Sequence, residues 1–185
     1  MKFMHCLASV VLASMLGACG EVQNQKIIGR APVDYVNPYM GNISHLLVPT
    51  FPTIHLPNSM LRVYPERADY TTDQLNGLPL IVTSHRGSSA FNLSPYQGDS
   101  LRPVIAYSYD DEKLKPYYYE VFLDDAEINV KYAPSHQSAL YQIEYGQPNK
   151  PAYMMINSQN GAIKAGDGFV SGYQQLQNNT CVYLY

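Results

Sequence analysis

The carboxylate side chains are the residues best suited to acid–base chemistry, and they gather in two clusters, Asp110-Asp111-Glu112 and Asp124-Asp125. Inverting hydrolysis of a glycosidic bond, for example, needs an acid and a base carboxylate roughly 6.5–9.5 Å apart. Both clusters fall between predicted strands, where aspartate is favoured in hairpin turns for backbone reasons. We therefore expect turn-forming roles for both clusters and no catalytic residue in the chain.

A second group with chemical potential is the polar run Ser84-His85-Arg86, whose side chains could reach the hydroxyls of a sugar. We predict these three as carbohydrate-binding residues. His45, His55 and His85 could in principle ligate zinc. No short ligand spacing such as His-x-x-x-His joins them, so we expect loop or packing roles and no metal site.

The N-terminus has the pattern of an exported lipoprotein. Lys2 precedes an apolar segment, Cys6–Leu16, which is too short to cross a bilayer as a helix. Leu16-Gly17-Ala18-Cys19 resembles the bacterial box before whose cysteine the signal is cut and on which lipid is placed. The alternative is an ordinary secretory signal that happens to contain a cysteine.

This pattern predicts a signal peptide at 1–18, a lipid on Cys19, a polar tether at 19–30 and a membrane-anchored location in the bacterial cell envelope. Cys6 would leave with the signal, so Cys181 would be the one remaining thiol and no disulfide or cysteine-based metal site is expected. Cys181 lies in a predicted strand, where we expect burial as a small hydrophobe.

Tyrosine dominates the aromatic residues, with 17 Tyr against 5 Phe and no Trp. In Tyr117-Tyr118-Tyr119 the first and third side chains would share one face of a strand. Such rings can stack on a sugar or fill a core and its rim, and the core role is the more common of the two.

Composition excludes several classes of protein. The net charge of −3 argues against a nucleic-acid-binding protein, and 13 prolines with 12 glycines argue against long helices and coiled coils. Hydrophobic residues make up 46% of the chain, too many for a disordered protein. Charged residues make up 15%, against roughly 25% in typical soluble domains.

The body of the chain reads as short strands separated by turns. The runs rich in Tyr, Val, Ile or Phe are Met60–Tyr64, Leu78–Thr83, Val104–Tyr109, Tyr117–Leu123, Glu127–Tyr132, Ala139–Tyr145, Ala152–Asn157, Gly168–Tyr173 and Thr180–Tyr185. Alternation places Ile128, Val130 and Tyr132 on one face. Short strands at this spacing predict an all-β fold, an antiparallel β-sandwich over residues 31–185.

The run Thr180–Tyr185 reaches the last residue of the chain. An exposed aromatic edge invites aggregation, so we expect the domain to continue in a longer protein or in a separate partner. The alternative is a terminal strand paired within the sheet.

An ordered set of motifs in Asp34–Arg67 carries a family resemblance. Asn37-Pro38 and Gly41 form the first element, and Thr50-Phe51-Pro52, Pro57 and Met60 form the second, with Pro65 following. Downstream, Ser84-His85, Gly98-Asp99 and Pro116–Ala126 continue the order. This order resembles the opening of glycoside hydrolase family 92, the calcium-dependent exo-acting α-mannosidases.

The resemblance implies a β-sandwich that precedes a larger helical barrel, with the catalytic carboxylates and most calcium ligands on the barrel. The chain would then be a non-catalytic N-terminal domain without its own cofactor, and calcium would be met only in a complete enzyme. Asn58-Ser59 replaces the family's Phe-Gly, and the family's Trp-rich sugar segment has no counterpart. The resemblance therefore bears more on fold than on mannose specificity.

Two functions follow as expectations. The first is a carbohydrate-binding and scaffolding domain of a family-92-like α-mannosidase, with a mannose-containing glycan, the membrane and a missing helical-barrel domain as partners and no role for nucleic acid. The second is a stand-alone, lipid-anchored carbohydrate-binding lipoprotein without catalysis.

Overall fold

The structure, a computed structural model of the chain, describes residues 29–40, 51–68, 71–84, 88–102, 104 and 106–185. The chain divides into residues 1–31 and 32–185, and the second unit holds all the strands described below. The predicted signal peptide, the lipidated Cys19 and most of the tether lie outside the described residues.

Short strands account for nearly all the regular structure. In chain order they are β1 (Ile54–His55), β2 (Arg62–Val63), β3 (Gln74–Leu75), β4 (Leu78–Ser84), β5 (Ser88–Gln97), β6 (Tyr107–Lys115), β7 (Tyr118–Leu123), β8 (Ile128–Pro134), β9 (Ala139–Tyr145), β10 (Ala152–Asn157), β11 (Gly161–Ala165), β12 (Val170–Gln175) and β13 (Cys181–Leu184). Two short 3₁₀ segments, η1 (Pro32–Tyr35) and η2 (Gln177–Asn179), complete the described elements. None of the described helices has the length and apolar character needed to cross a membrane.

A five-stranded antiparallel sheet, in the order β3-β6-β7-β8-β9, supplies one wall of the core. Its register pairs Tyr119 with Tyr132, Val121 with Val130 and Leu123 with Ile128. All six side chains are buried, because alternate residues of each strand face the same side. The shared face predicted for Ile128, Val130 and Tyr132 is therefore confirmed.

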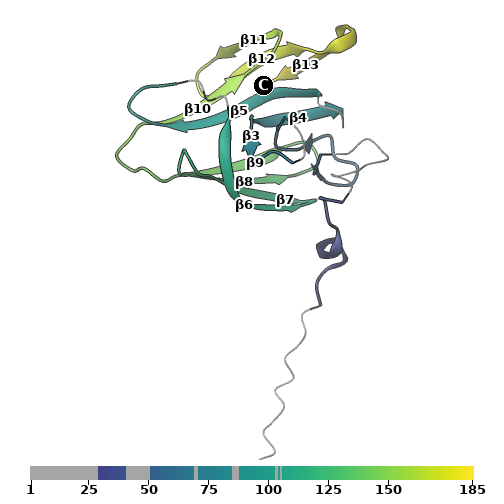
Figure 1. Cartoon of the computed structure of the whole chain (residues 1–185). Helices are drawn as coiled ribbons and strands as arrows, with labels where there is room; N and C mark the ends of the chain where they lie inside the picture. The colour runs from purple at the N-terminus through teal and green to yellow at the C-terminus, as the bar shows by residue number, and fades with distance from the viewer. Residues whose placement is uncertain (1–28, 41–50, 69–70, 85–87, 103, 105) are drawn as a thin grey trace, which may run out of the picture. The chain divides into compact units, whose positions relative to one another are not determined.

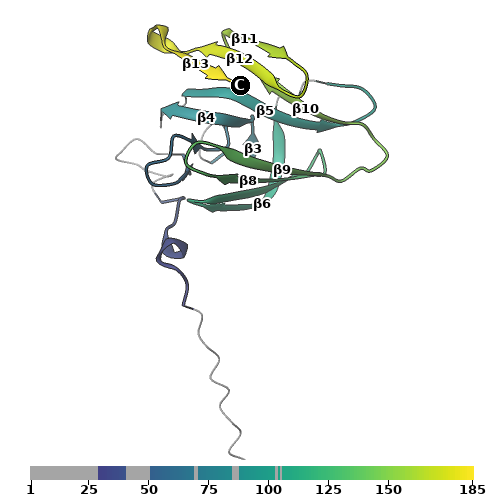
Figure 2. The same cartoon turned by 180° about the vertical axis from the view of Figure 1, so that it is seen from behind.

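A second antiparallel sheet, β10-β5-β4, covers this wall. Leu78 of β4 and Leu93 of β5 join the buried cluster formed by the five-stranded sheet, and Ile54 of β1 and Val63 of β2 close it. Each large side chain buried here contributes about 1.5–3 kcal/mol. The predicted all-β antiparallel sandwich is thus confirmed (Figures 1 and 2).

A third sheet, β11-β12-β13, lies beside β5 and β10 on the side away from the five-stranded sheet in both views (Figures 1 and 2). Tyr183 and Tyr185 are 77% and 93% exposed at its end. Cys181 is exposed as well, so the expectation of burial was wrong. The predicted strand itself agrees with β13. The third sheet leaves one face exposed, and a strand pattern does not tell whether a given residue lies on the exposed or the covered face.

Sequence reasoning missed β1, β3, β5 and β11. The ten-residue β5 was overlooked because Pro95 and three serines interrupt its apolar pattern. The pairing of β4 with β5 ends at Leu93, so among the described strands only β10 pairs with β5 at Pro95, and a proline on a one-sided stretch of strand is tolerated. The Pro95 carbonyl accepts a hydrogen bond from the Tyr107 hydroxyl at 2.8 Å, and the ring is buried.

Candidate functional site

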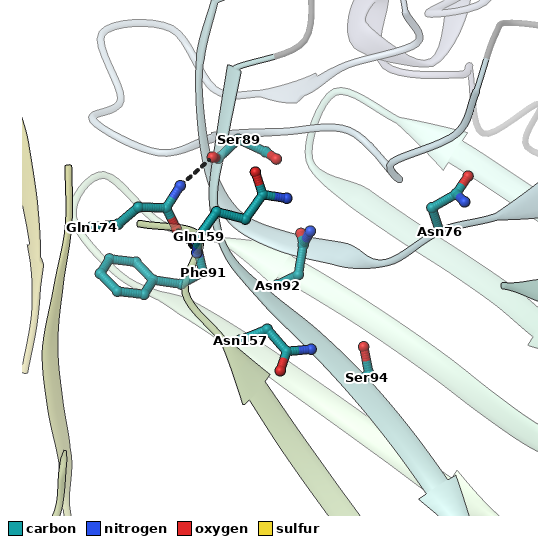
Figure 3. Close-up of a pocket in the computed structure, with 8 residues that line it drawn as sticks. All are labelled: Asn76, Ser89, Phe91, Asn92, Ser94, Asn157, Gln159 and Gln174. Atoms are coloured by element: carbon teal, nitrogen blue, oxygen red, sulfur yellow. Dashed lines mark hydrogen bonds between the residues drawn. The ribbon is translucent and has the colours of Figure 1, made fainter. Parts of the chain in front are cut away.

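A polar pocket of about 180 Å³ lies between β5, β10 and β12 (Figure 3). Its lining residues are Asn76, Ser89, Phe91, Asn92, Ser94, Asn157, Gln159 and Gln174. All but Phe91 carry an amide or a hydroxyl, so the wall is uncharged and rich in hydrogen-bonding groups.

The register of β5 and β10 places the central amides. Asn92 of β5 is the cross-strand partner of Asn157 of β10, so the two side chains project from the same face. Ser94 shares that face, whereas Leu93 between them points into the core. One strand thus serves the core with one face and the pocket with the other.

Gln174 of β12 fixes the third sheet to this face and is only 4% exposed. Its Oε1 accepts hydrogen bonds from the backbone N–H of Phe91 at 3.1 Å and of Gln159 at 3.2 Å. Its Nε2 donates to the carbonyl of Ser89 at 2.9 Å, the dashed line in Figure 3. Phe91 has a φ of 56°, which is unusual for a bulky residue. Its backbone N–H finds its partner in the Gln174 side chain of the third sheet.

A second pocket of about 210 Å³ adjoins the first and shares Ser89, Gln159 and Gln174 with it. Its further lining residues are Glu66, Asn160, Gln175, Leu176 and Gln177. We call the two pockets together the amide groove. Among the described residues that line the groove, Glu66 is the only one with an ionisable side chain.

Backbone and side-chain bonds hold Glu66 in place. Its N–H donates to the carbonyl of Gly77 at 2.9 Å, and its carbonyl accepts from the N–H of Asn76 at 2.6 Å. Its Oε2 accepts a hydrogen bond from Nδ2 of Asn92, which connects the two pockets. The site is tight at Gly77, because a Cβ at this position would lie 3.1 Å from Cγ of Asn92 and the amide would have to shift.

The groove has the chemistry of a binding site for a hydroxyl-rich ligand. A side-chain amide offers a donor and an acceptor side by side, which suits neighbouring hydroxyls. Glycoside hydrolysis needs two carboxyl groups across the scissile bond. The described lining residues supply one, so they can bind such a ligand without forming that catalytic pair.

The predicted sugar-binding residues lie at the β4–β5 connection. Ser84 is the last residue of β4 and pairs with Ser88, while His85 and Arg86 lie outside the described residues. Ser89, which lines both pockets, is the second residue of β5 after this connection. Their role in sugar binding therefore stays a prediction. Sequence reasoning missed the groove itself, because single Asn and Gln residues carry no motif.

The first acidic cluster is not a turn, contrary to expectation. Asp110, Asp111 and Glu112 lie within β6, where the pairing with β7 shifts between Asp110 and Lys113. Asp111 adopts a φ of 52°, which lets the extra residue form a bulge. The second cluster does occupy the predicted turn between β7 and β8. There burial, and then the charge of Asp110, raises the pKa of Asp124.

The bulge directs Glu112 into a buried ion pair. Its Oε1 lies 2.6 Å from Nη2 of Arg67, and it also accepts a hydrogen bond from the Tyr119 hydroxyl at 3.1 Å. Arg67 donates to the Tyr109 hydroxyl at 3.0 Å, and Tyr39 donates to Oε2 of Glu112 at 3.2 Å. Burial alone would lower the pKa of Arg67, but the Glu112 carboxylate outweighs it and the pKa is raised. The network ties the N-terminal segment to the sandwich.

The tyrosine run divides between surface and core. Tyr119 is buried, whereas Tyr117 is 39% exposed and donates to Oδ1 of Asp34 at 2.8 Å. Tyr118 donates to Oε2 of Glu120 at 3.0 Å. Tyr119 thus has the predicted core role, and the other two hydroxyls serve surface contacts.

No metal site emerges from the histidines or carboxylates that the structure describes. His45 and His85 lie outside the described residues, and Nε2 of His55 faces the carbonyl of Ser59 at 3.3 Å. No group of three or more His, Cys, Asp or Glu side chains within the described part of the chain could hold a metal ion.

The motif residues of the N-terminal region have structural roles. The Asn37 side chain accepts from the N–H of Tyr39 at 3.0 Å, within the turn that contains Pro38. Phe51 stacks on Tyr64 with ring centroids 4.7 Å apart, and Pro52 is buried. Gly41 lies outside the described residues.

The second part of the motif forms a turn that contacts the connection between β8 and β9. Pro57 and Asn58, whose φ is 57°, occupy the centre of a turn closed by the N–H of Ser59 and the carbonyl of Leu56. Met60 has an exposed side chain, and its N–H donates to the carbonyl of His136 at 2.8 Å. Of the Asn58-Ser59 pair, Asn58 has the positive φ, a conformation that asparagine tolerates better than most residues.

Comparisons with known proteins agree with this geometry. The model of the glycosyl hydrolase family 92 N-terminal domain matches residues 35–183. Two solved structures of the family GH92 α-mannosidase BT3965 from Bacteroides thetaiotaomicron, one in complex with mannoimidazole, share the fold with TM-scores of 0.62 and 0.63 at 20% identity. Each similarity covers 76% of this chain but only 22% or 23% of the solved chain. A comparison with curated protein sequences found no match.

Proposed function

Because the chain belongs to glycosyl hydrolase family 92 and carries that family's N-terminal domain, we propose that it is the glycan-binding and scaffolding part of an α-mannosidase, without catalytic activity of its own. The chain spans less than a quarter of the solved mannosidase chains. The catalytic groups of the whole enzyme would therefore be supplied by a helical-barrel partner.

The observation that carries the proposal is the amide groove. The side chains of its first pocket come from four separate parts of the chain and converge on one uncharged, hydrogen-bonding wall. A mannose-containing glycan presents the complementary surface, because each ring carries several adjacent hydroxyls. Ser84, His85 and Arg86 remain our candidates for extending this surface at the β4–β5 connection.

Placement in the cell is part of the proposal. The box ending at Cys19 supports lipid attachment and a membrane-anchored position in the bacterial cell envelope. Metabolic labelling with a fatty acid checks this, since label should be lost in Cys19→Ser and retention of label in that variant would contradict lipidation at this residue.

On the same proposal, calcium would be bound only in the assembled enzyme.

Glycan binding by the full chain is the central test. We expect mannose oligosaccharides to bind in calorimetric titration, and Gln159→Ala to weaken binding about fivefold, because one hydrogen bond is worth about 1 kcal/mol. Gln142→Ala is the matched control, since Gln142 is also an exposed glutamine but lies on β9. Absence of binding to any mannose oligosaccharide, or release of free mannose by the chain alone, would contradict the proposal.

A stand-alone lipid-anchored carbohydrate-binding lipoprotein is the second candidate, favoured by one observation. The groove is built entirely within residues 66–177 and needs no second domain to form its walls. The DNA downstream of codon 185 separates the two candidates. A reading frame for a helical barrel, continuous or adjacent, supports the first, and its absence there supports the second.

A further inference from the structure

We infer that the amide groove is a two-ring site that takes a neutral disaccharide unit and rejects acidic sugars, with Gln174 as the fixed wall between the rings and Glu66 as the excluding charge. This inference rests on the proposed glycan-binding function and specifies the ligand class.

The two pockets are similar in size and adjacent. Their volumes are about 180 and 210 Å³, and each is of the size of one pyranose ring with its hydroxyls. Ser89, Gln159 and Gln174 line both. A ligand that fills the two pockets would therefore be two linked rings passing across these three residues.

The Gln174 side chain lies between the two pockets and is held in a fixed position. Its Oε1 and Nε2 are bound to the backbones of Phe91, Gln159 and Ser89, and its side chain is buried. A side chain held by three hydrogen bonds acts as part of the scaffold. It sets the position at which the two rings would be joined.

The neighbouring amides are available for a ligand. Within the described part of the chain, the side chains of Asn76, Asn157 and Gln159 make no hydrogen bond to the protein, and all three are exposed. Oδ1 of Asn92 is a buried acceptor without a donor. Its orientation is set because Nδ2 of the same amide is bound to Glu66. A ligand hydroxyl in the first pocket would supply the missing donor.

The Glu66 carboxylate gives the groove a negative charge, and no positively charged side chain among the described lining residues balances it. Glu66 is held by Asn92 and by its backbone bridge to Gly77, so its carboxylate stays at the second pocket. No Lys or Arg side chain is among the described residues that line either pocket. A carboxylate on the ligand would face like charge in a partly desolvated site, which disfavours uronic and sialic acid units.

Calorimetry on the full chain tests both parts of the inference. The probes are mannose, an α-linked mannobiose and a disaccharide that carries one uronic acid. We expect mannobiose to bind about tenfold or more tightly than mannose, since a second ring adds its own hydrogen bonds. We expect the acidic disaccharide to bind at least about tenfold more weakly than mannobiose at low salt.

Glu66→Gln keeps an acceptor for Asn92 and removes the charge, so this variant should bind the acidic and neutral disaccharides about equally. Glu144→Gln, a matched change on the exposed β9, should keep the discrimination. Salt provides a test that needs no variant, because raising ionic strength should strengthen binding of the acidic disaccharide alone.

Each outcome has one meaning. Equal binding of mannose and mannobiose overturns the two-ring site. The role of Glu66 is overturned if binding of the acidic disaccharide does not respond to salt, or if it is the same in Glu66→Gln as in the parent chain. The proposed function survives either result. Failure of every sugar to bind removes the proposed function and this inference with it.

Discussion

Two tyrosines that face each other across neighbouring strands differ in one hydrogen bond. The hydroxyl of Tyr119 donates to Glu112, whereas the hydroxyl of Tyr132 is buried without a partner. The rings are cross-strand partners and are 2% and 1% exposed. A buried polar group without a partner destabilises a fold, and the same group with a partner stabilises it.

Replacing each tyrosine with phenylalanine should therefore have opposite effects. We expect Tyr132→Phe to raise the free energy of unfolding by about 1 kcal/mol, because it removes an unpaired hydroxyl and keeps the ring. Tyr119→Phe should lower it by about 1–3 kcal/mol, because Glu112 loses a donor in a buried site. Urea denaturation of the two variants and the parent measures both changes. Equal changes of the same sign would show that the hydroxyl of Tyr132 has a partner in solution.

At the scale of elements, single irregular residues decide how the sheets meet. Asp111 in the bulge of β6 directs Glu112 inward to Arg67, and Phe91 in β5 turns its N–H toward Gln174. Both are non-glycine residues with positive φ. Such strained positions persist where surrounding bonds hold them, and here these are a buried ion pair and a buried amide.

Gln174 should thus be a main attachment of the third sheet. We expect Gln174→Ala to lower the free energy of unfolding by about 2–4 kcal/mol, because it leaves the N–H groups of Phe91 and Gln159 and the carbonyl of Ser89 without partners. The control is Gln175→Ala, since Gln175 is the exposed neighbour whose side chain bonds only Asn179. Chemical denaturation compares the two variants. Equal stability would mean that the apolar contacts of the sheets suffice to hold them together.

At the scale of the whole molecule, a core that contains titratable tyrosine hydroxyls makes the stability of the fold sensitive to alkaline pH. Burial raises the pKa of Tyr119 and Tyr141 well above the usual value near 10, and raises that of Tyr132 to about 12. A group whose pKa is raised in the folded state contributes stability that is complete below its unfolded pKa. That contribution is lost as the pH rises through the interval up to the folded pKa.

Stability should accordingly be flat up to about pH 10 and fall steeply above it, by about 1.4 kcal/mol per pH unit for each buried tyrosine. Guanidinium unfolding at a series of pH values from 8 to about 11.5 measures this slope. Tyr132→Phe is the control, because it should reduce the slope between about pH 10 and 12 by the contribution of one group. A stability that stays level through pH 11 would contradict the role assigned to the buried tyrosines.

The amino-acid sequence by itself determined the strand composition, most of the strand positions from Tyr107 onward and the family. These depend on local alternation and on ordered motifs, which are readable along the chain, as in β8 and β9. Only the tertiary structure decided the inward turn of Glu112, the exposure of Cys181 and the amide groove. The physical reason is that each depends on register between distant strands. Asn92 meets Asn157 through strand pairing, and Gln174 meets Phe91 across 83 positions of the sequence.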